Sequence, residues 1–343
     1  MSGTFRIRPA HQTDFDALMQ IAVESGPGFT SLPVDEAVLR ERLAKSEEAF
    51  NGAPGDPAYG KYLLMLEDFE TGEIGGCSAV KAGTGVDAPF FNYRIITVSH
   101  TSREADRQFN LDALILTNEF LGYTEVGTLF LREPFRGSGA GILASQARYL
   151  LMTTSPESFG DMVLSELRGV INEAGETPFW EGLGRHFFRM SFAEADLLSA
   201  TTDNQFILDL MPKYPIYIDL LPPEAREVIG RCHVDGVPAM KLLEREGFRF
   251  DRMVDIFDGG PIMVAPRNMI RTVRESRRVK LILGHDGAQT GLVSTTELKT
   301  FRAALLTGAP HGDDQFAVSE ETFAQLELKP GDEAMIWLRS DTE

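Results

Sequence analysis

Several residue types and patterns are scarce in this chain of 343 residues, and each scarcity excludes a class of protein. Only two cysteines occur, so a disulfide framework is excluded, and no CxxC pair or HExxH motif points to zinc. No run of about 18 uncharged apolar residues is present, which argues against a membrane-spanning helix. The first residues lack the charged-then-apolar layout of a signal peptide. We therefore expect a cytoplasmic protein without a metal site.

Basic residues are also scarce relative to acidic ones. The 33 Lys and Arg residues face 51 Asp and Glu residues, which gives a formal net charge of −18. A nucleic-acid partner would require a basic face that displaces counterions, so such a partner is not expected. The acidity suits a cationic substrate, although it could instead serve only to keep the surface soluble.

The chain is long and apolar enough for a large core, at 43% hydrophobic residues, and periodicity divides it into strands and helices. Glycine-containing residues 70–73 predict a hairpin turn between two strands. Beyond residue 277 the pattern changes to short strands and turns, which indicates a small β-rich module. The main expected elements are strands at 5–10, 91–102, 126–135, 161–170, 215–221 and 249–257, and helices at 11–25, 35–50, 142–154, 223–233 and 238–248.

A run of glycines stands directly behind the strand at 126–135. These glycines allow positive φ angles and a close approach of the backbone to a ligand. The helix that follows would direct its unpaired N–H groups at the same ligand, which predicts an anion site. The residues concerned are Arg136, Gly137, Ser138, Gly139, Ala140 and Gly141.

Two well-known phosphate loops do not fit this run. The Walker loop requires GxxxxGK followed by Ser or Thr, which the sequence lacks. The dinucleotide fingerprint GxGxxG fails because no third glycine follows Gly139 and Gly141 at the required spacing. The remaining pattern, Arg-x-x-Gly-x-Gly, resembles the pyrophosphate loop of the GCN5-related N-acyltransferases. A strand before it, and a strand and a helix containing Phe179 and Trp180 after it, follow that family's order.

Longer stretches resemble a more specific family, the bacterial arginine N-succinyltransferases. They include GPGFTSLP, VGTLFLREPFRGSGAG, TPFWEGLGRHFF, VIGRCHVDGVPAMKLLEREGF and DIFDGGP, in the family's order. The resemblance implies an α+β fold, with an acyltransferase core whose mixed, mostly antiparallel sheet is flanked by helices. We divide the chain into this core at residues 1–200, a second α/β part at 201–278 and the β-rich C-terminal module at 279–343.

The resemblance also implies an activity: transfer of a succinyl group from succinyl-CoA to the α-amine of L-arginine. The products would be N2-succinylarginine and CoA, at the entry to arginine catabolism. Succinyl-CoA would be a co-substrate, and no permanently bound cofactor is expected. Besides these two small molecules, we expect the partner to be a second copy of the chain or a related chain, with no membrane involved.

An amine that attacks a thioester must be deprotonated, and the reaction needs donors for the oxyanion and a proton for the leaving thiolate. The resemblance assigns a succinyl-CoA contact to Leu129, whose backbone N–H could bind the oxyanion while its side chain belongs to the core. It assigns the proton donor to His233, and an imidazole changes protonation near neutral pH. From spacing alone, His233 could equally cap the end of a helix.

Cys232 stands next to His233, but adjacent residues point to different sides of an element, so we expect Cys232 to be structural. Arg136 is the expected contact of the CoA pyrophosphate. Two further arginines near the loop are Arg132 and Arg148, and we expect Arg148 at the surface.

A guanidinium substrate calls for carboxylates. Glu166, at the end of a strand, and Asp255 and Asp258, in a glycine turn, are the candidates, although each could be a structural acid. Thr30 and Ser31 lie in a segment that could cover the amino acid, or they could cap the following helix.

Three other interpretations remain open. The same fold could act on ornithine, another amine or another acyl-CoA, which a competition among substrates would reveal. A non-catalytic subunit of a paired enzyme would bind CoA without turnover. A nucleotide-binding module would bind ATP, although the missing Walker lysine disfavours it.

Overall fold

The structure is a computed structural model that describes residues 4–26, 31–52, 57–137, 139–172, 175–202, 204–284 and 287–339. The strands of the larger part are β1 (Phe5–Pro9), β2 (Lys61–Asp68), β3 (Ile74–Lys81), β4 (Asn92–Ser102), β5 (Arg107–Thr117), β6 (Thr124–Leu131), β7 (Met162–Glu166), β8 (Ile216–Tyr217), β9 (Arg249–Asp255) and β10 (Pro261–Pro266). The C-terminal strands are β11 (Arg277–Leu283), β12 (Gln289–Ser294), β13 (Ala303–His311), β14 (Gln315–Val318) and β15 (Glu333–Leu338).

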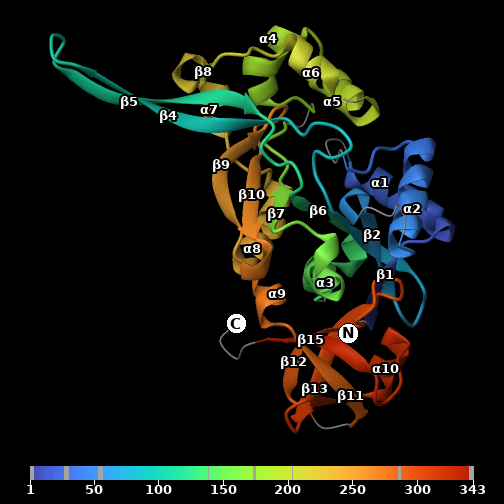
Figure 1. The fold of residues 1–343 in the computed structure, drawn as a ribbon. Helices are drawn as coiled ribbons and strands as arrows, with labels where there is room; N and C mark the ends of the chain where they lie inside the picture. The colour runs from blue at the N-terminus through green and yellow to red at the C-terminus, as the bar shows by residue number, and fades with distance from the viewer. Residues whose placement is uncertain are drawn as a thin grey trace.

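The α-helices lie around these strands (Figure 1). They are α1 (Phe15–Ser25), α2 (Glu36–Phe50), α3 (Ala140–Thr154), α4 (Arg185–Phe188), α5 (Phe192–Thr201), α6 (Gln205–Leu210), α7 (Pro223–Val228), α8 (Val237–Glu246), α9 (Arg271–Glu275) and α10 (Glu320–Leu326). Among the described residues, none of the helices has the length and apolar character needed to cross a bilayer.

All strands are hydrogen-bonded in the order β12-β15-β11-β14-β13-β1-β2-β3-β6-β7-β10-β9-β4-β5-β8. Most neighbours in the larger part are antiparallel, and β6 and β7 are parallel. The α+β class expected from the sequence is confirmed. The predicted hairpin is also confirmed, since β2 and β3 are joined by a turn in which Gly72 adopts a φ of 75°.

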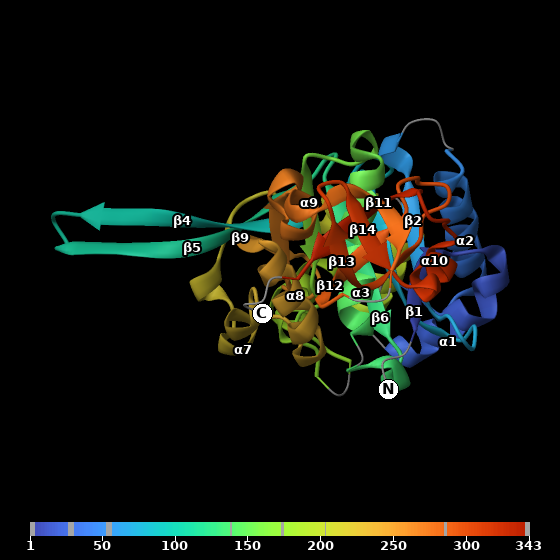
Figure 2. The ribbon, with the colours of Figure 1, turned by 90° about the horizontal axis from the view of Figure 1, so that it is seen from below.

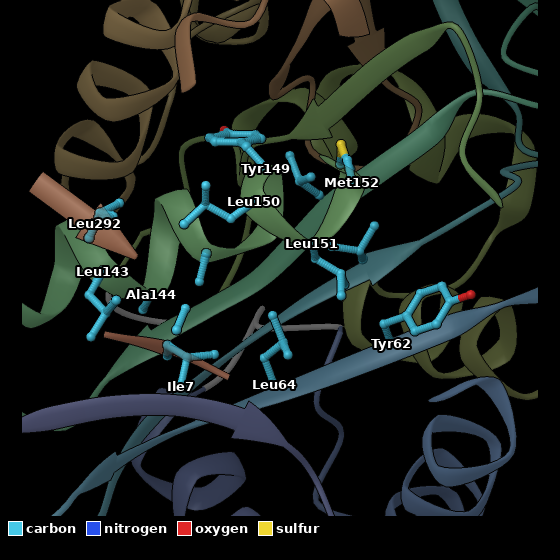
Figure 3. Close-up of a cluster of buried hydrophobic side chains, with 14 of the residues drawn as sticks. Ile7, Tyr62, Leu64, Leu143, Ala144, Tyr149, Leu150, Leu151, Met152 and Leu292 are labelled. Carbon is cyan, nitrogen blue, oxygen red and sulfur yellow. The ribbon is translucent and has the colours of Figure 1, made fainter. Parts of the chain in front are cut away.

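The central strand β2 has a continuous apolar pattern because both of its faces are covered. Leu63 and Met65 pack on the side of α1 and α2, whereas Leu64 and Leu66 pack on the side of α3. Figure 3 shows the second of these layers, in which side chains of α3 meet β1 and β2. The helix α3 is therefore buried along most of its length, and its N-terminus is held firmly against the sheet.

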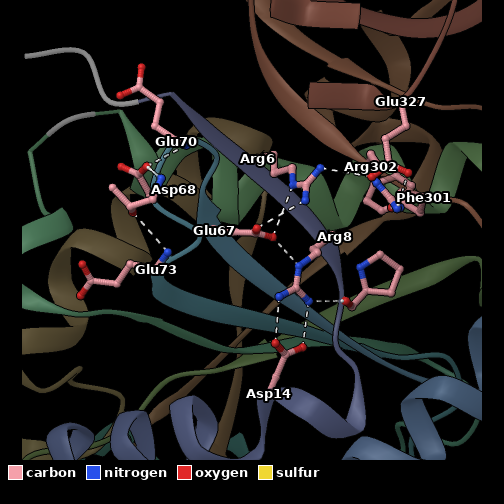
Figure 4. A network of polar contacts seen from close by, with 12 residues as sticks. Arg6, Arg8, Asp14, Glu67, Asp68, Glu70, Glu73, Phe301, Arg302 and Glu327 are labelled. Atoms are coloured by element: carbon pink, nitrogen blue, oxygen red, sulfur yellow. Dashed lines mark hydrogen bonds and ion pairs between the residues drawn. The ribbon is translucent and has the colours of Figure 1, made fainter. Parts of the chain in front are cut away.

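The C-terminal module closes into a small barrel, because β12 pairs with β13 as well as with β15. The barrel is joined to the larger part through β1, where Arg6 and Ile7 pair with Ala304 and Ala303. Side chains reinforce this junction (Figure 4). Arg6 and Arg302 both pair with Glu327, at 3.2 and 2.8 Å, and Arg6 also pairs with Glu67 at 3.3 Å.

Strands β4 and β5 form a long hairpin that projects from the body as an arm (Figures 1 and 2). They pair with each other from Asn92 and Thr117 to Ser102 and Arg107. Within the described residues, β9 pairs with β4 only up to Arg94, and β8 pairs with β5 only near Leu114. The outer part of the arm therefore has no neighbouring strand on either edge. The sequence pattern predicted β4 but not its partner β5.

Candidate functional site

Strands β6 and β7 run in parallel but separate toward their carboxyl ends. Their register pairs Thr124 with Val163 and Glu125 with Leu164, and no later pair joins them within the described residues, although β6 continues to Leu131. Ligands of open sheets that contain parallel strands bind beyond the carboxyl ends of those strands. The glycine loop follows β6, and residues 167–170 follow β7, so both segments lie at this edge.

Strand β6 contains a bulge before the glycine loop. Its register with β3 shifts between Cys77 and Ala79, so that Thr128 and Leu129 lie opposite Ser78 alone. Thr128 has a positive φ of 52°, which is uncommon for a branched residue. The Leu129 side chain packs against the main core, as expected from the sequence. A bulge of this kind redirects the backbone locally, here at the residue that the sequence assigned to the acyl donor.

The predicted anion loop has the expected geometry in its described part. Gly137 and Gly139 have φ angles of 82° and 85°, and α3 begins at Ala140 directly behind Gly139. The first turn of α3 contains no acidic residue, and its first N–H groups have no acceptor within the helix. A Cβ on Gly141 would lie 3.2 Å from the Leu131 side chain, so this glycine allows close packing. Ser138 lies outside the described residues.

The three arginines near the loop have different roles. Arg132 forms ion pairs with Glu24 and Glu73, at 3.2 and 2.9 Å. Arg136 is exposed, and its Nε donates to the Leu131 carbonyl over 3.0 Å, which holds its guanidinium beside the loop. The expectation that Arg148 lies at the surface is wrong, because its side chain is buried and donates to the Ser145 carbonyl. The sequence periodicity missed this because α3 is covered on more than one side.

His233 begins a helix rather than ending one. The predicted helix over 223–233 is too long, because α7 ends at Val228 and Gly230 turns the chain with a φ of 71°. The His233 N–H donates to the Arg168 carbonyl over 2.8 Å, which fixes it beside the loop after β7. Its Nδ1 accepts from the Asp235 N–H at 3.3 Å. The same Nδ1 lies 3.5 Å from the Asp235 carboxylate, with which a protonated ring can pair, so Nε2 is the nitrogen left for a substrate.

Asp258 ties the turn between β9 and β10 to the loop after β7. Its two carboxylate oxygens accept from the N–H groups of Gly169 and Gly260, both at 2.7 Å. Gly230 joins the same group, because its N–H donates to the Gly259 carbonyl over 2.8 Å. Three segments that are distant in sequence therefore meet here. Asp258 is buried and both of its oxygens are already hydrogen-bonded.

Glu166 and Asp255 form a close carboxyl pair next to this junction. Burial raises the pKa of Glu166 well above its usual range, and the nearby Asp255 raises it further. Burial also raises the pKa of Asp255, although two backbone N–H groups, of Phe257 and Asp258, donate to its Oδ1 at 2.7 Å. The Oε1 of Glu166 is buried without a hydrogen-bond partner among the described residues. A cationic group with several N–H donors would offset the cost of burying these two carboxyl groups.

Strand register places one more polar side chain on the same face of the sheet. Asn92 of β4 pairs directly with Asp255 of β9. On the other side of β9, Gly260 lies opposite Asp255, and Ile262, two residues later in β10, pairs with Glu166 of β7. Directly paired residues of antiparallel strands share a face, so Asn92, Asp255 and Glu166 do as well. Asn92 is fully buried, and neither its Oδ1 nor its Nδ2 has a partner in the described part of the chain.

Sequence reasoning missed several residues around this pair. Asn92 and Arg168 stand in ordinary strand and loop contexts, so no sequence signal distinguishes them. Asp196, on α5, is a further acid near Asp255. Burial raises the pKa of Asp196 to about 6, and the charge of Asp255 contributes to this increase. Cys232, by contrast, behaves as expected: its side chain packs against the core, and burial raises the pKa of its thiol to about 11.

The segment before α2 contains Thr30 and Ser31, which were expected either to cap this helix or to cover the amino acid. Asp35 caps α2, with its side chain accepting from the Val38 N–H over 2.9 Å, so Ser31 does not have that role. Thr30 lies outside the described residues, and the covering role of this segment stays a prediction.

Comparisons with known proteins agree with one another. The family described as "Arginine N-succinyltransferase beta subunit" matches residues 5–272, and the family described as its C-terminal domain matches residues 276–337. The arginine N-succinyltransferases of Salmonella paratyphi B and Salmonella typhimurium are each 39% identical to this chain over 329 residues, covering 95% of both chains. The solved structure of arginine/ornithine succinyltransferase subunit AI from Pseudomonas aeruginosa matches with a TM-score of 0.90 and 32% identity, covering 98% of this chain and 99% of that one.

Proposed function

This chain belongs to the arginine N-succinyltransferase family, and we propose that it transfers the succinyl group of succinyl-CoA to the α-amine of L-arginine. Membership of the family makes the chain an acyltransferase of arginine catabolism. One structural observation carries the assignment of the site. A glycine loop suited to phosphate follows β6, and the buried carboxyl pair suited to a guanidinium includes Glu166, the last residue of the neighbouring strand β7.

The acyl donor would bind at the glycine loop and along β6. The positive φ angles of Gly137 and Gly139 and the N-terminus of α3 favour the CoA pyrophosphate, with Ser138, Ala140 and Gly141 completing the loop. The exposed Arg136 would add a charge-assisted contact. The backbone at Leu129, redirected by the bulge, would then meet the thioester carbonyl and stabilise the oxyanion as it develops.

The arginine substrate would place its guanidinium against Glu166 and Asp255. Burial makes both carboxyl groups costly to ionise, and a cation with five donors would remove that cost. Asp258 would hold the turn that carries Asp255, because its own oxygens are already hydrogen-bonded to Gly169 and Gly260.

His233 would handle the protons. The α-amine nitrogen attacks the thioester carbon, a C–N bond forms, and the C–S bond breaks with its electron pair going to sulfur. The thiolate then needs one proton, and the acylated nitrogen must lose one. The protonated ring of His233, with Nδ1 beside the Asp235 carboxylate, would donate the Nε2 proton to the sulfur, and the neutral ring would then take the proton that the acylated nitrogen loses. Direct transfer between two bound substrates needs no covalent enzyme intermediate.

Assembly and location complete the proposal. We expect the chain to work as an oligomer, either a homodimer or a pair with a related chain. The projecting arm of β4 and β5 supports this expectation, because an isolated two-stranded hairpin is marginally stable in water. Both cysteines are unpaired, which suits the reducing cytoplasm that we propose as its location.

The first test measures thiol release from succinyl-CoA by the purified chain with and without L-arginine. We expect release that requires both substrates and that falls about 100-fold or more in His233→Ala, within the range for loss of a general acid–base group. Cys232→Ala is the matched control, since it alters the adjacent residue and should keep most of the activity.

Acetyl-CoA and ornithine, measured alongside, define the preferred substrates. Thiol release that does not depend on an amine acceptor, or CoA binding without any turnover, would contradict a self-sufficient enzyme. The second of these results would instead support a non-catalytic subunit.

A further inference from the structure

Arg168 lies at the junction of the three site segments. It lies two residues beyond the end of β7, and its carbonyl accepts the N–H of His233 over 2.8 Å. The carboxylate of Asp258 is held by the N–H of the next residue, Gly169, at 2.7 Å. The backbone of Arg168 is therefore fixed between the histidine and the acidic turn.

The side chain of Arg168 does not use the acids around it. It is half-buried, and its Nε is buried without a hydrogen-bond partner among the described residues. No ion pair joins it to a carboxylate of the described chain, although Asp258 and Asp235 are near enough to act on it electrostatically. Burial lowers its pKa, and these two acids only partly oppose the effect.

A buried guanidinium N–H without a hydrogen-bond partner is unfavourable, so the Nε–H of Arg168 needs an explanation. The neighbouring acid does not provide one, because both Asp258 oxygens already accept from backbone N–H groups. An anion that enters only with the substrates would provide it. Because Arg168 lies beside His233, at the proposed reacting end of the substrates, the anionic groups within its reach are their carboxylates, whereas the phosphates of CoA lie at the other end of that molecule.

We propose that Arg168 binds a substrate carboxylate in the ternary complex, which rests on the proposed function. Two carboxylates are available there: the distal carboxylate of the succinyl group and the α-carboxylate of arginine. Both have the planar geometry that a guanidinium can hold through two parallel hydrogen bonds. Arg168 would thus act as a specificity residue, selecting either a dicarboxylic acyl group or an amino acid over an uncharged analogue.

The test compares wild type with Arg168→Gln and Arg168→Lys on four substrate combinations. Succinyl-CoA is compared with butyryl-CoA, which lacks the distal carboxylate, and L-arginine is compared with L-argininamide, which lacks the α-carboxylate. The readout is kcat/KM, or an inhibition constant where an analogue turns over too slowly. Arg267→Gln is the control, because Arg267 is half-buried at the other end of β10 and bonds the Gly160 carbonyl.

We expect Arg168→Gln to lower the preference for one carboxylate about 10- to 100-fold, as for loss of a charge-assisted hydrogen bond, and to leave the other preference unchanged. The preference that falls identifies the bound carboxylate. Arg168→Lys should recover part of the lost preference, because lysine keeps the positive charge but cannot form the two parallel hydrogen bonds of a guanidinium. Arg267→Gln should leave both ratios unchanged.

An equal loss on all four combinations would overturn the proposal and assign Arg168 a structural role, as would unchanged ratios in Arg168→Gln. Because the readout is a ratio, a reduced amount of folded enzyme does not imitate the expected result. Failure of the proposed function is distinct, since wild type would then release no thiol from succinyl-CoA and L-arginine.

Discussion

At the scale of single residues, the proposed acceptor site contains buried polar atoms that have no partner in the described part of the chain. Native structures hydrogen-bond nearly all buried polar groups, so exceptions need a reason. The amide of Asn92 and the Oε1 of Glu166 are such exceptions on one face of the sheet, and the Nε of Arg168 is a third nearby. Such a grouping is what the proposed site for a polar, charged amino acid would require.

The carboxyl pair gives a prediction about stability and binding together. The folded-state pKa of Glu166 is raised, so the folded protein holds a proton that the unfolded chain releases above the ordinary Glu pKa. Stability contributed by this group therefore falls as the pH rises from that value through the raised pKa. We expect Glu166→Gln to raise the free energy of unfolding by about 1 to 3 kcal/mol at pH 8, and to have no such effect near pH 4.

Urea denaturation at both pH values measures this difference, and L-arginine is then added at pH 8. It should stabilise wild type clearly and Glu166→Gln little, because ligand binding stabilises only a folded state that retains the site. Glu227→Gln, on an exposed position of α7, is the control and should change neither quantity. A Glu166→Gln variant that is destabilised at every pH would contradict a binding role for the pair.

At the scale of elements, the loop between β6 and α3 depends on two left-handed glycines placed against a buried helix. Burial of α3 fixes the direction of its N-terminus. The positive φ angles of Gly137 and Gly139 turn the chain from the end of β6 into the first turn of this helix. The proposed donor site would therefore depend on backbone conformation more than on side chains.

Gly139→Ala tests the loop, with Gly312→Ala as a matched control. Both glycines have positive φ angles, 85° and 70°, and neither substitution meets an atom closer than 3.6 Å. Each alanine should therefore lower the free energy of unfolding by a similar amount, about 1 kcal/mol. We expect only Gly139→Ala to weaken CoA binding, by about tenfold or more, because its Cβ and any local shift would lie at the phosphate. Calorimetric titration with CoA measures this, and equal affinities in the two variants would place the phosphate elsewhere.

At the scale of the whole molecule, a continuous ladder of strands connects the C-terminal barrel, the central sheet and the arm. The barrel is attached through β1 and β13 and through the ion pairs of Arg6 and Arg302 with Glu327. At the other end, the arm exposes residues such as Phe109, at 48%. An extended hairpin with open edges and exposed apolar surface favours contact with another chain.

The arm gives a prediction about assembly. Residues 97–112 can be replaced by Asn-Gly, which closes the shortened hairpin on the paired residues Ile96 and Ala113. Light scattering coupled to size-exclusion chromatography should find an oligomer for wild type and a smaller species for the shortened chain. An oligomer that persists without the arm would assign the contact to another surface, and a monomeric wild type would leave the related-chain pair as the remaining form of assembly.

The sequence by itself determined the features that depend on local chain chemistry. The glycine loop, the hairpin turn at Gly72, the β-rich C-terminal module and the family resemblance are all contained in short, contiguous stretches, because φ preferences and periodicity act over a few residues. The division of the chain at residue 200 stays a prediction. So do the assignments of Leu129 to succinyl-CoA binding and of His233 to catalysis, which came from the resemblance.

Only the tertiary structure decided which distant residues share a face. Asn92, Glu166 and Asp255 come from three strands, and their side chains share a face because strand register, set by non-local pairing, puts them on one side of the sheet. Burial is decided at the same level, which is why Arg148 is inside and Asp258 is used by backbone N–H groups. A sequence pattern can name a charged residue, but whether that charge is satisfied, and hence whether it awaits a ligand, depends on what the rest of the chain packs around it.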